Sequence, residues 1–436
     1  HDNFFELGGH SLLAVSLIGR MRHIGLSADV KVLFSQPTLA ALASAVGGSD
    51  EPGSDEVTVA TNLITPGCQR ITPDLLPLIK LTQEQIDLVV ACVPGGAANV
   101  QDIYPLAPLQ EGILYHHIAA EQGDPYVLQS QFAFDSRAHL DSFAQALQTV
   151  INRHDILRTS MHWESLDEPL QVVWRHVELS VEDVQLNPDL GDISRQLQER
   201  LDPRQMRLDI RQAPLMRLVC TLDTVNQRWL ATLMFHHMIL DHTALDQVRH
   251  EMQVCLLGQA DQLGDSIPYR NYVAQARLGL NEQDHELFFK DMLGDIDEPT
   301  LPFDLHDVQG DGNAIDQARL MLDSGLSQRL RVQARQLGVS AASLLHLAFA
   351  QMLGRLSGRE QVVFGTVLMG RMQSGEGAER ALGMFINTLP LRVDLGKQGV
   401  RDGVKATHQR LTGLLGHENA SLALAQRCSG VVAPAP

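Results

Sequence analysis

The chain lacks several features that define large classes of proteins. None of its apolar runs is long enough to cross a bilayer, so we expect no transmembrane helix and no membrane partner. An excess of basic residues is also missing. The formal net charge is −18, which argues against nucleic acid as a partner because phosphate binding needs a basic face. No signal peptide opens the sequence, and the odd number of cysteines without a framework predicts reduced thiols in a cytoplasm.

Paired cysteines are absent as well. The five cysteines are widely scattered and form no C-x-x-C pair; they are Cys68, Cys92, Cys220, Cys255 and Cys428. An odd number without a framework predicts reduced thiols and provides no zinc site. The sequence contains no H-E-x-x-H motif either, and we expect no bound metal.

The length and the distribution of residue types predict several folded units. A chain of 436 residues is too long for one compact core. Residues 1–46 have helical patterns and form a first domain, and residues 47–69, rich in Gly, Ser, Asp and Glu at their start, form a linker. The chain starts with His1 inside a motif and ends in "VVAPAP", so we expect a segment of a longer polypeptide.

Beyond residue 70, helix-like and strand-like segments alternate, which predicts a mixed α/β unit of two lobes. We place the lobes at residues 70–262 and 263–436. The clearest elements are a helix over 142–159, a buried strand at 229–235, a helix from Thr243 with a capping box to Asp246, and strands at 361–370 and 385–393.

A histidine doublet follows the buried strand, in "HHMILDH". Neutral imidazole is abundant at pH 7 and can accept a proton, so both histidines are catalytic candidates. Neighbours in an extended segment face opposite ways, which favours His236 as a hydrogen-bonded core residue and His237 as the reactive one. A zinc site of His237 and Asp241 is disfavoured because a third ligand is not evident. A chance doublet is the remaining alternative.

Asp241, four residues after His237, is expected to anchor the loop or to pair with an arginine. The candidates for that arginine are Arg158 and, failing it, Arg392.

A second doublet lies in "HHIAAEQGD", which contains His116, His117, Gly123 and Asp124. Taken alone, this segment is typical of a helix end, where histidines favour the helix dipole and a glycine stops the helix.

Ser11, in "DNFFELGGHSLLA", follows two glycines and opens an apolar helix. The helix dipole and free backbone N–H groups would stabilise a phosphodiester at this position. An N-cap serine is the local alternative. A nucleophile elbow fits poorly because Leu13 stands where that motif requires glycine.

The Ser11 segment closely resembles the phosphopantetheine attachment motif of carrier domains in nonribosomal peptide synthetases. The resemblance implies that Ser11 carries a covalent 4′-phosphopantetheine, added by a phosphopantetheinyl transferase, whose thiol holds an amino acid or peptide as a thioester. It also implies that the chain works with an upstream adenylation domain and downstream adenylation and carrier domains. Only the latter half of a carrier domain is expected here.

Residues 102–424 resemble a condensation domain of these synthetases. The matching motifs are "YPLAPLQEGILYHH", "RHDILRT", "HHMILDH", "IPYRNYV", "LGMFINTLPLRV" and "HENASLALAQR". The resemblance implies a two-lobed, chloramphenicol-acetyltransferase-like α/β fold, C-terminally incomplete, with a tunnel between the lobes. It makes His237 the catalytic histidine and Asp241 a structural aspartate, and it adds Asn387 to the structural or tunnel residues.

The second doublet is similar to the motif that marks dual epimerization and condensation domains. That resemblance implies inversion at Cα of the carrier-bound acyl group before peptide-bond formation, with His116 or His117 supporting proton exchange. Where most condensation domains have glycine after the aspartate, this chain has His242, so we expect a changed loop there.

Three other functions compete with this interpretation. A plain condensation domain would join a donor that already has the D configuration. A non-catalytic carrier and docking fragment would hold a thioester without reacting it. A CoA-dependent acyltransferase shares the H-x-x-x-D pattern and is disfavoured by the carrier serine on the same chain.

Overall fold

The computed structural model describes most of the chain, and every structural statement below refers to that part. The described residues are 2–9, 13–14, 17–18, 20–21, 24, 26, 28, 30–46, 59–120, 122–278, 282–305, 316–371, 380–396 and 398–431. The chain divides into two compact units. The first unit comprises His1–Thr58, Ala276–Glu379 and Ile386–Pro436, and the second comprises Val59–Gln275 and Arg380–Phe385.

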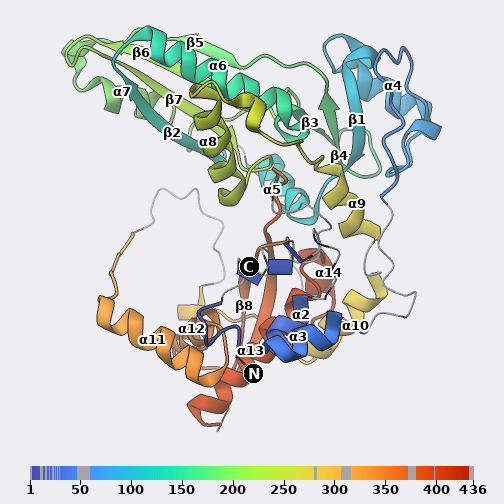
Figure 1. The fold of residues 1–436 in the computed structure, drawn as a ribbon, viewed down its shortest axis with the longest axis vertical. Coiled ribbons are helices and arrows are strands. Elements are labelled where there is room, and N and C mark those ends of the chain that lie inside the picture. Colours follow the sequence, from blue (N-terminus) through green and yellow to red (C-terminus); the bar gives the residue numbers. More distant parts are fainter. Residues whose placement is uncertain are drawn as a thin grey trace. The chain divides into compact units, whose positions relative to one another are not determined.

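The second unit is built on two sheets (Figure 1). The smaller has the order β1 (Val100–Pro105), β4 (Leu170–Trp174), β3 (Thr159–His162), all antiparallel. The larger has the order β2 (Val127–Phe134), β7 (Arg228–His236), β6 (Met216–Asp223), β5 (Ser180–Asp183), antiparallel except for the parallel pair β5 and β6. β7 is thus an inner strand, and its last residue, His236, pairs with Val127 at the start of β2.

Six α-helices begin in the second unit. They are α4 (Gln83–Ala91), α5 (Pro108–Ala119), α6 (Arg137–Arg153), α7 (Ile193–Arg200), α8 (His242–Leu256) and α9 (Arg270–Leu278). α6 and α8 pack on each other. α7 packs through Ile193 and Leu197 on a cluster that includes Met234 of β7. Because alternate strand residues face opposite ways, this contact fixes which side chains of β7 point to that face.

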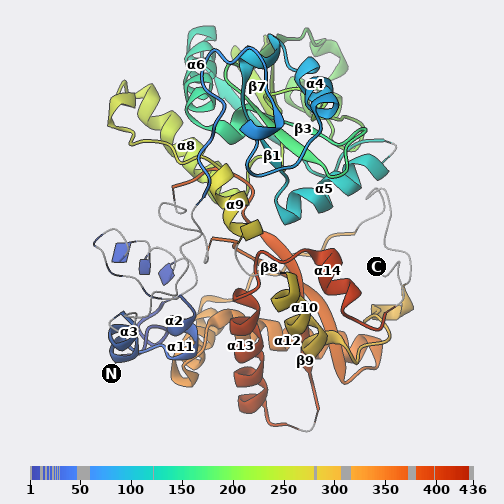
Figure 2. The same cartoon turned by 90° about the vertical axis from the view of Figure 1, so that its right-hand side faces the viewer.

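The first unit contains a two-stranded sheet and seven described α-helices (Figure 2). The helices are α2 (Val30–Ser35), α3 (Leu39–Val46), α10 (Glu282–Leu293), α11 (Ser324–Leu337), α12 (Ala341–Ser357), α13 (Val400–Leu415) and α14 (Leu422–Arg427). The strands are β8 (Gln361–Leu368) and β9 (Asn387–Asp394). β8 and β9 pair antiparallel, which confirms the two strands expected there.

The described part of residues 1–46 shares a core with helices far along the chain. Phe5 and Leu33 belong to the same buried cluster as Leu347 of α12. The ring of His408 in α13 donates from Nε2 to the carbonyl of Phe34, 3.2 Å away. The described part of this helical segment therefore packs on the same buried cluster as α12.

Short 3₁₀ helices connect several of these elements. They are η1 (Pro73–Leu75), η2 (Gly96–Asn99), η3 (Asp155–Arg158), η4 (Pro188–Leu190), η5 (Ala260–Gln262) and η6 (Pro302–Asp304). The helix expected over 142–159 ends at Arg153, and η3 follows it. The Asp155 carboxylate accepts the backbone N–H of Tyr269 at 2.9 Å. This tertiary hydrogen bond favours η3 over a continuation of the α-helix.

The boundary between the units also differs from the expected one after residue 262. The second unit continues to Gln275 and receives Arg380–Phe385 from a distant part of the sequence. A hydrogen bond of 2.5 Å from the Tyr269 hydroxyl to the carbonyl of Met384 holds that segment in place. Two distant motifs thus meet, "IPYRNYV" and "LGMFINTLPLRV", which sequence order had placed in one lobe.

No single described helix is long and apolar enough to span a membrane. The one combination that satisfies the length and composition is α11 with α12, and this pair is bent by 107°.

Candidate active site

The doublet after β7 separates its two imidazoles as the strand geometry predicts. His236 is fully buried, which confirms the expectation of a hydrogen-bonded core histidine, and His237 is half-buried. The Nδ1–H of His237 donates to the carbonyl of Leu240 at 2.7 Å, and its backbone N–H donates to the carbonyl of Tyr126 at 2.8 Å. A neutral ring held this way keeps Nε2 unprotonated, as a proton acceptor needs.

Asp241 is the N-cap of α8 and not the partner of an arginine we named. Its Oδ1 accepts the N–H of Ala244 at 2.7 Å, and its Oδ2 accepts the N–H of Phe385 at 3.3 Å. The capping box expected from Thr243 is therefore wrong, because the helix starts one residue earlier, at His242. An aspartate before a helix satisfies free N–H groups of the first turn, and here it also holds the incoming segment.

His242 causes no unusual backbone. It is the exposed first residue of α8, and it has no positive φ, so the tight turn that would favour glycine is not present. The histidine is therefore accommodated by ordinary helical backbone at this position. The position that requires glycine is Gly383, with φ +152°, where a Cβ would come within 2.2 Å of the Tyr269 ring.

The doublet at the end of α5 separates its imidazoles in the opposite order. His116 is exposed, and its ring lies 6.0 Å from that of Tyr126. His117 is buried, and it continues the buried stripe of Gln110, Ile113 and Leu114 on α5. Of the two candidates, the structure places His117 next to the other histidine motif.

Gly123 lets the chain turn sharply from α5 to β2. Its φ is +64°, and a Cβ there would lie 2.2 Å from the carbonyl oxygen of Arg204. The turn directs the carboxylate of Asp124 inward, where it is buried. The helix stop expected from the sequence is present, and it also positions Asp124.

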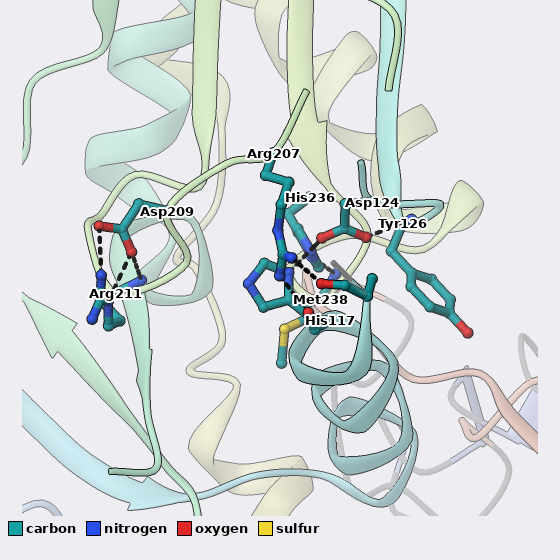
Figure 3. Close-up of polar contacts among 9 residues, drawn as sticks. His117, Asp124, Tyr126, Arg207, Asp209, Arg211, His236 and Met238 are labelled. Carbon is teal, nitrogen blue, oxygen red and sulfur yellow. Dashed lines mark hydrogen bonds and ion pairs between the residues drawn. The ribbon is translucent and has the colours of Figure 1, made fainter. Parts of the chain in front are cut away.

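One oxygen of Asp124 joins the two histidine motifs (Figure 3). Its Oδ2 lies 2.5 Å from Nδ1 of His117 and 3.0 Å from Nε2 of His236. Its Oδ1 accepts the backbone N–H of Tyr126 at 2.9 Å. We name His117, Asp124 and His236 the relay cluster.

The hydrogen bonds fix the protons of the relay cluster. The N–H of Met238 donates to Nδ1 of His236 at 3.2 Å, so a neutral His236 carries its proton on Nε2 and donates to Asp124. His117 then donates from Nδ1 to the same carboxylate. Among the described residues Nε2 of His117 has no hydrogen-bond partner, so the ring presents a free, oriented acceptor.

The charges of the cluster follow from its burial and its bonds. Burial alone would raise the pKa of Asp124, but the hydrogen bonds from His117 and His236 outweigh it and hold the pKa well below its ordinary value. Burial lowers the pKa of His236, which keeps that ring neutral. The ionised carboxylate therefore accepts a hydrogen bond from each of the two imidazoles and orients both rings.

The relay cluster resembles a metal site in composition, since its three ligand-type atoms lie within 4.8 Å of one another. A cation on Nε2 of His236 would need a lone pair there. Because Nδ1 already accepts the N–H of Met238, a lone pair on Nε2 would require an imidazolate. The tautomer therefore favours a hydrogen-bonded cluster over a metal centre.

Gln110 supports the loop of the first doublet and was missed by our sequence reasoning. Its amide donates to the carbonyl of Met238 at 2.9 Å, and its oxygen accepts from Gln171 at 3.0 Å. It is completely buried, so these bonds fix the residue after His237. Its place in the motif "YPLAPLQEG" is the signal that could have found it.

The remaining predicted residues have structural roles. Arg158 donates to the carbonyl of Trp174 and to Gln101, and Arg392 pairs with Asp295 and Asp394. Neither arginine pairs with Asp241, so both candidates for its partner are wrong. Asn387 donates to the carbonyls of Glu418 and Ala420 at 2.8 and 2.7 Å, which joins two motifs of the first unit.

Ser11 lies outside the described residues. The glycines before it are described and fit the turn of an attachment loop. Gly8 has φ +96°, and a Cβ on Gly9 would lie 2.4 Å from the ring of Phe4. The chain next to Ser11 therefore accepts only a bare backbone at this turn.

Two families match this chain. Residues 100–429 match the condensation domain family, and residues 1–46 match the phosphopantetheine attachment site family.

Curated relatives are much longer than this chain. Malpinin synthetase of Mortierella alpina is 50% identical over 436 residues, which is 100% of this chain and 6% of that protein. Malpibaldin synthetase of the same organism is 49% identical over 436 residues and 8% of its own length. A linear gramicidin synthase protein of Brevibacillus parabrevis is 32% identical over 360 residues, 80% of this chain and 4% of that protein. The chain spans less than a tenth of each of these relatives.

Solved structures show the fold. The condensation domain of the Monacolin K polyketide synthase has a TM-score of 0.59 at 19% identity and covers 78% of this chain and 80% of its own. A four-domain nonribosomal peptide synthetase bound to AMP and glycine has a TM-score of 0.60 at 20% identity, covering 76% and 25%. The chain has the chloramphenicol-acetyltransferase-like α/β fold of these domains. It belongs to the condensation domain family, preceded by an attachment segment for covalent 4′-phosphopantetheine.

Proposed function

We propose that this chain forms a peptide bond between two carrier-bound acyl groups and, before that step, exchanges the α-proton of the donor. The observation that carries the proposal is the relay cluster, because one carboxylate joins the two histidine motifs. Together these motifs provide two imidazoles, His117 and His237, whose Nδ1 positions are anchored and whose Nε2 positions are proton acceptors.

The peptide bond forms when a neutral amine attacks a thioester carbonyl. His237 is suited to hold the acceptor amine and to take its proton, since a proton acceptor at the end of a rigid strand loses little orientation. Leu240 and Tyr126 fix its ring and backbone. His237 is half-buried, so part of the residue is exposed.

The donor reaches this site as a thioester, and the thiol of the prosthetic group supplies that linkage. We propose Ser11 as the attachment residue and a phosphopantetheinyl transferase as the enzyme that modifies it. The other proposed partners are an upstream adenylation domain and downstream adenylation and carrier domains of the same synthetase. The five free cysteines agree with a cytoplasmic location.

Exchange of the α-proton needs a base on one face of Cα and a proton donor on the other. His117 is suited to one of these roles because Asp124 orients its ring. His237 is suited to the other. The second doublet and Asp124 therefore have a chemical reason to occur together, which is the inversion of the donor to a D residue.

The burial of His117 favours a second candidate function. Its side chain is only 9% exposed, as expected for a scaffold. In that case the relay cluster only supports the strand end that carries His237, and the protein is a plain condensation domain that takes a D donor.

A deuterium experiment separates the two functions. The full-length protein is loaded at Ser11 with an L-aminoacyl group in deuterated buffer, and the released amino acid is analysed by chiral chromatography and mass spectrometry. Deuterium at Cα with D product supports exchange, and its loss in His117→Ala assigns one of the two proton-transfer roles to His117. Retained protium with normal peptide formation from a D donor would leave the plain condensation domain.

A further inference from the structure

The segment Leu201–Arg211 contacts the corner that carries His117 and Asp124. It connects α7 to β6 and contains no regular helix or strand. The carbonyl of Pro203 accepts the backbone N–H of Asp124 at 2.8 Å. The next carbonyl, of Arg204, occupies the space that a side chain at Gly123 would need. One short segment thus fixes the backbone on one side of the His117–Asp124 hydrogen bond.

Arg207 fixes the backbone on the other side. Its guanidinium donates to two carbonyls at the end of α5, those of His117 and Ala120 (Figure 3). The last carbonyls of a helix have no partner within the helix, and a cation there also favours the helix dipole. Arg207 therefore supplies donors to the last turn of α5, which carries the imidazole that faces Asp124.

The two partners of one hydrogen bond are consequently held by neighbouring groups of a single segment. Pro203 holds Asp124, and Arg207 holds His117, only four residues further along. The far end of the segment is anchored as well, because the carbonyl of Ile210 accepts the N–H of Met161 at 2.8 Å. Proton transfer depends steeply on position, and a displacement of about 1 Å can lower a rate about 100-fold.

We propose that Arg207 is a positioning residue for the imidazole of His117. It acts through the backbone of α5 and through the His117–Asp124 bond, and it sets the rate of α-proton exchange rather than that of peptide-bond formation. This inference rests on the proposed exchange function.

A matched control lies in the same segment. Arg211 carries the same charge, is half exposed, and pairs with Asp209 and Glu164 rather than with α5. Removing Arg211 changes the charge of the segment equally and leaves the end of α5 intact.

The test uses the full-length protein loaded at Ser11, with two readouts. The first is deuterium entry at Cα of an L donor, and the second is peptide formation from a D donor. For R207A we expect exchange to fall about 10- to 100-fold and peptide formation to stay within about twofold. R211A is expected to stay within about twofold in both. Millimolar guanidinium ion is expected to restore part of the exchange in R207A, since it can fill the vacated donor position.

Each remaining outcome decides the matter. Equal losses of exchange and peptide formation in R207A would show a purely structural arginine and overturn the proposal. The proposal would also be overturned if R207A kept the exchange rate of R211A while H117A had lost exchange. Full exchange in H117A would overturn the proposed function itself, whatever R207A does. If R207A does not fold, R207K serves instead, with a smaller loss of exchange expected because an ammonium group cannot match the planar fork that bonds both carbonyls.

Discussion

The two histidine doublets use the same residues in opposite arrangements. At the end of β7 the first histidine, His236, is buried and the second, His237, is accessible. At the end of α5 the first, His116, is exposed and the second, His117, is buried. The two buried members meet at Asp124, and only His237 combines access with an anchored Nδ1.

The difference comes from the secondary structure on which each doublet lies. In an extended segment, neighbours point to opposite faces, so the two histidines at the end of β7 have different surroundings. In a helix, neighbours are about 100° apart, and the position of the buried stripe decides which is covered. A doublet is therefore not a functional unit, and each histidine acquires its role from the surface on which it lies.

The largest expected effect is that of His237→Ala. Removal of a positioned general base lowers rates about 10²- to 10⁴-fold, so we expect peptide formation to fall by that factor. Single-turnover assays with a preloaded donor and acceptor measure it. His116→Ala is the control, with rates within about twofold of wild type. If His237→Ala formed peptide at the wild-type rate, His237 would not differ in function from His116, and its assignment as the general base would be contradicted.

Asp124→Asn is expected to have the next largest effect. Oδ2 accepts from His117 and His236, and Oδ1 accepts the N–H of Tyr126, so an amide group must point an N–H at one of these donors. We expect the free energy of unfolding to fall by about 3 kcal/mol, measured by urea denaturation, and exchange to fall about 100-fold. Asp135→Asn, at an exposed site, is the control with about 0.5 kcal/mol or less. An unchanged free energy of unfolding in Asp124→Asn would mean that His117 and His236 do not share this carboxylate.

Two glycine substitutions test the corner after α5. Gly123→Ala places a Cβ 2.2 Å from the Arg204 carbonyl at φ +64°, and we expect a loss of about 2 to 3 kcal/mol in the free energy of unfolding. Gly112→Ala lies within α5 with open space around it, and we expect a gain of about 0.5 to 1 kcal/mol. Urea denaturation of both variants checks the signs. Similar effects of the two would show that the turn does not depend on glycine.

The pH dependence of the free energy of unfolding tests the protonation of the buried relay cluster. Burial lowers the pKa of His236, so the unfolded chain takes up a proton at higher pH than the folded chain does. Stability therefore falls as the pH drops through about 6.5 toward the lower folded-state pKa. Hydrogen bonds from His117 and His236 depress the folded-state pKa of Asp124. The stability that this carboxylate contributes is therefore lost only at pH below about 4.

Unfolding free energies at pH 7.5, 6.5 and 5.5, in wild type and His236→Gln, measure this effect. Burial also lowers the pKa values of His162, His285 and His408, which add to the slope of both proteins. The difference between the two slopes isolates His236, and identical slopes would contradict its neutral, buried state.

Local patterns predicted much of this molecule. The opposite facing of neighbours in an extended segment favoured His236 as the inward member, and the family motifs indicated the fold. The buried member of the second doublet also had a signal that was not used. Gln110, Ile113, Leu114 and His117 follow the i, i+3, i+4, i+7 spacing of one helix face.

Long-range partners were beyond such patterns. Asp124 and His236 are 112 residues apart, and no periodicity joins them. Arg207 sits in a segment without regular structure, so nothing in its neighbourhood indicated that it ends α5. Asp241 caps α8 and holds the segment of Phe385, and Arg158 and Arg392, the two arginines named from the sequence, have other partners.

Histidine tautomers test the central claim most directly. Long-range ¹H–¹⁵N spectra of the protein labelled at histidine, assigned with single His→Gln variants, report which ring nitrogen carries the proton. We predict protonated Nδ1 in His117 and His237 and protonated Nε2 in His236 at pH 7.5. A proton on Nε2 of His117, or on Nδ1 of His236, would contradict a carboxylate shared by the two motifs.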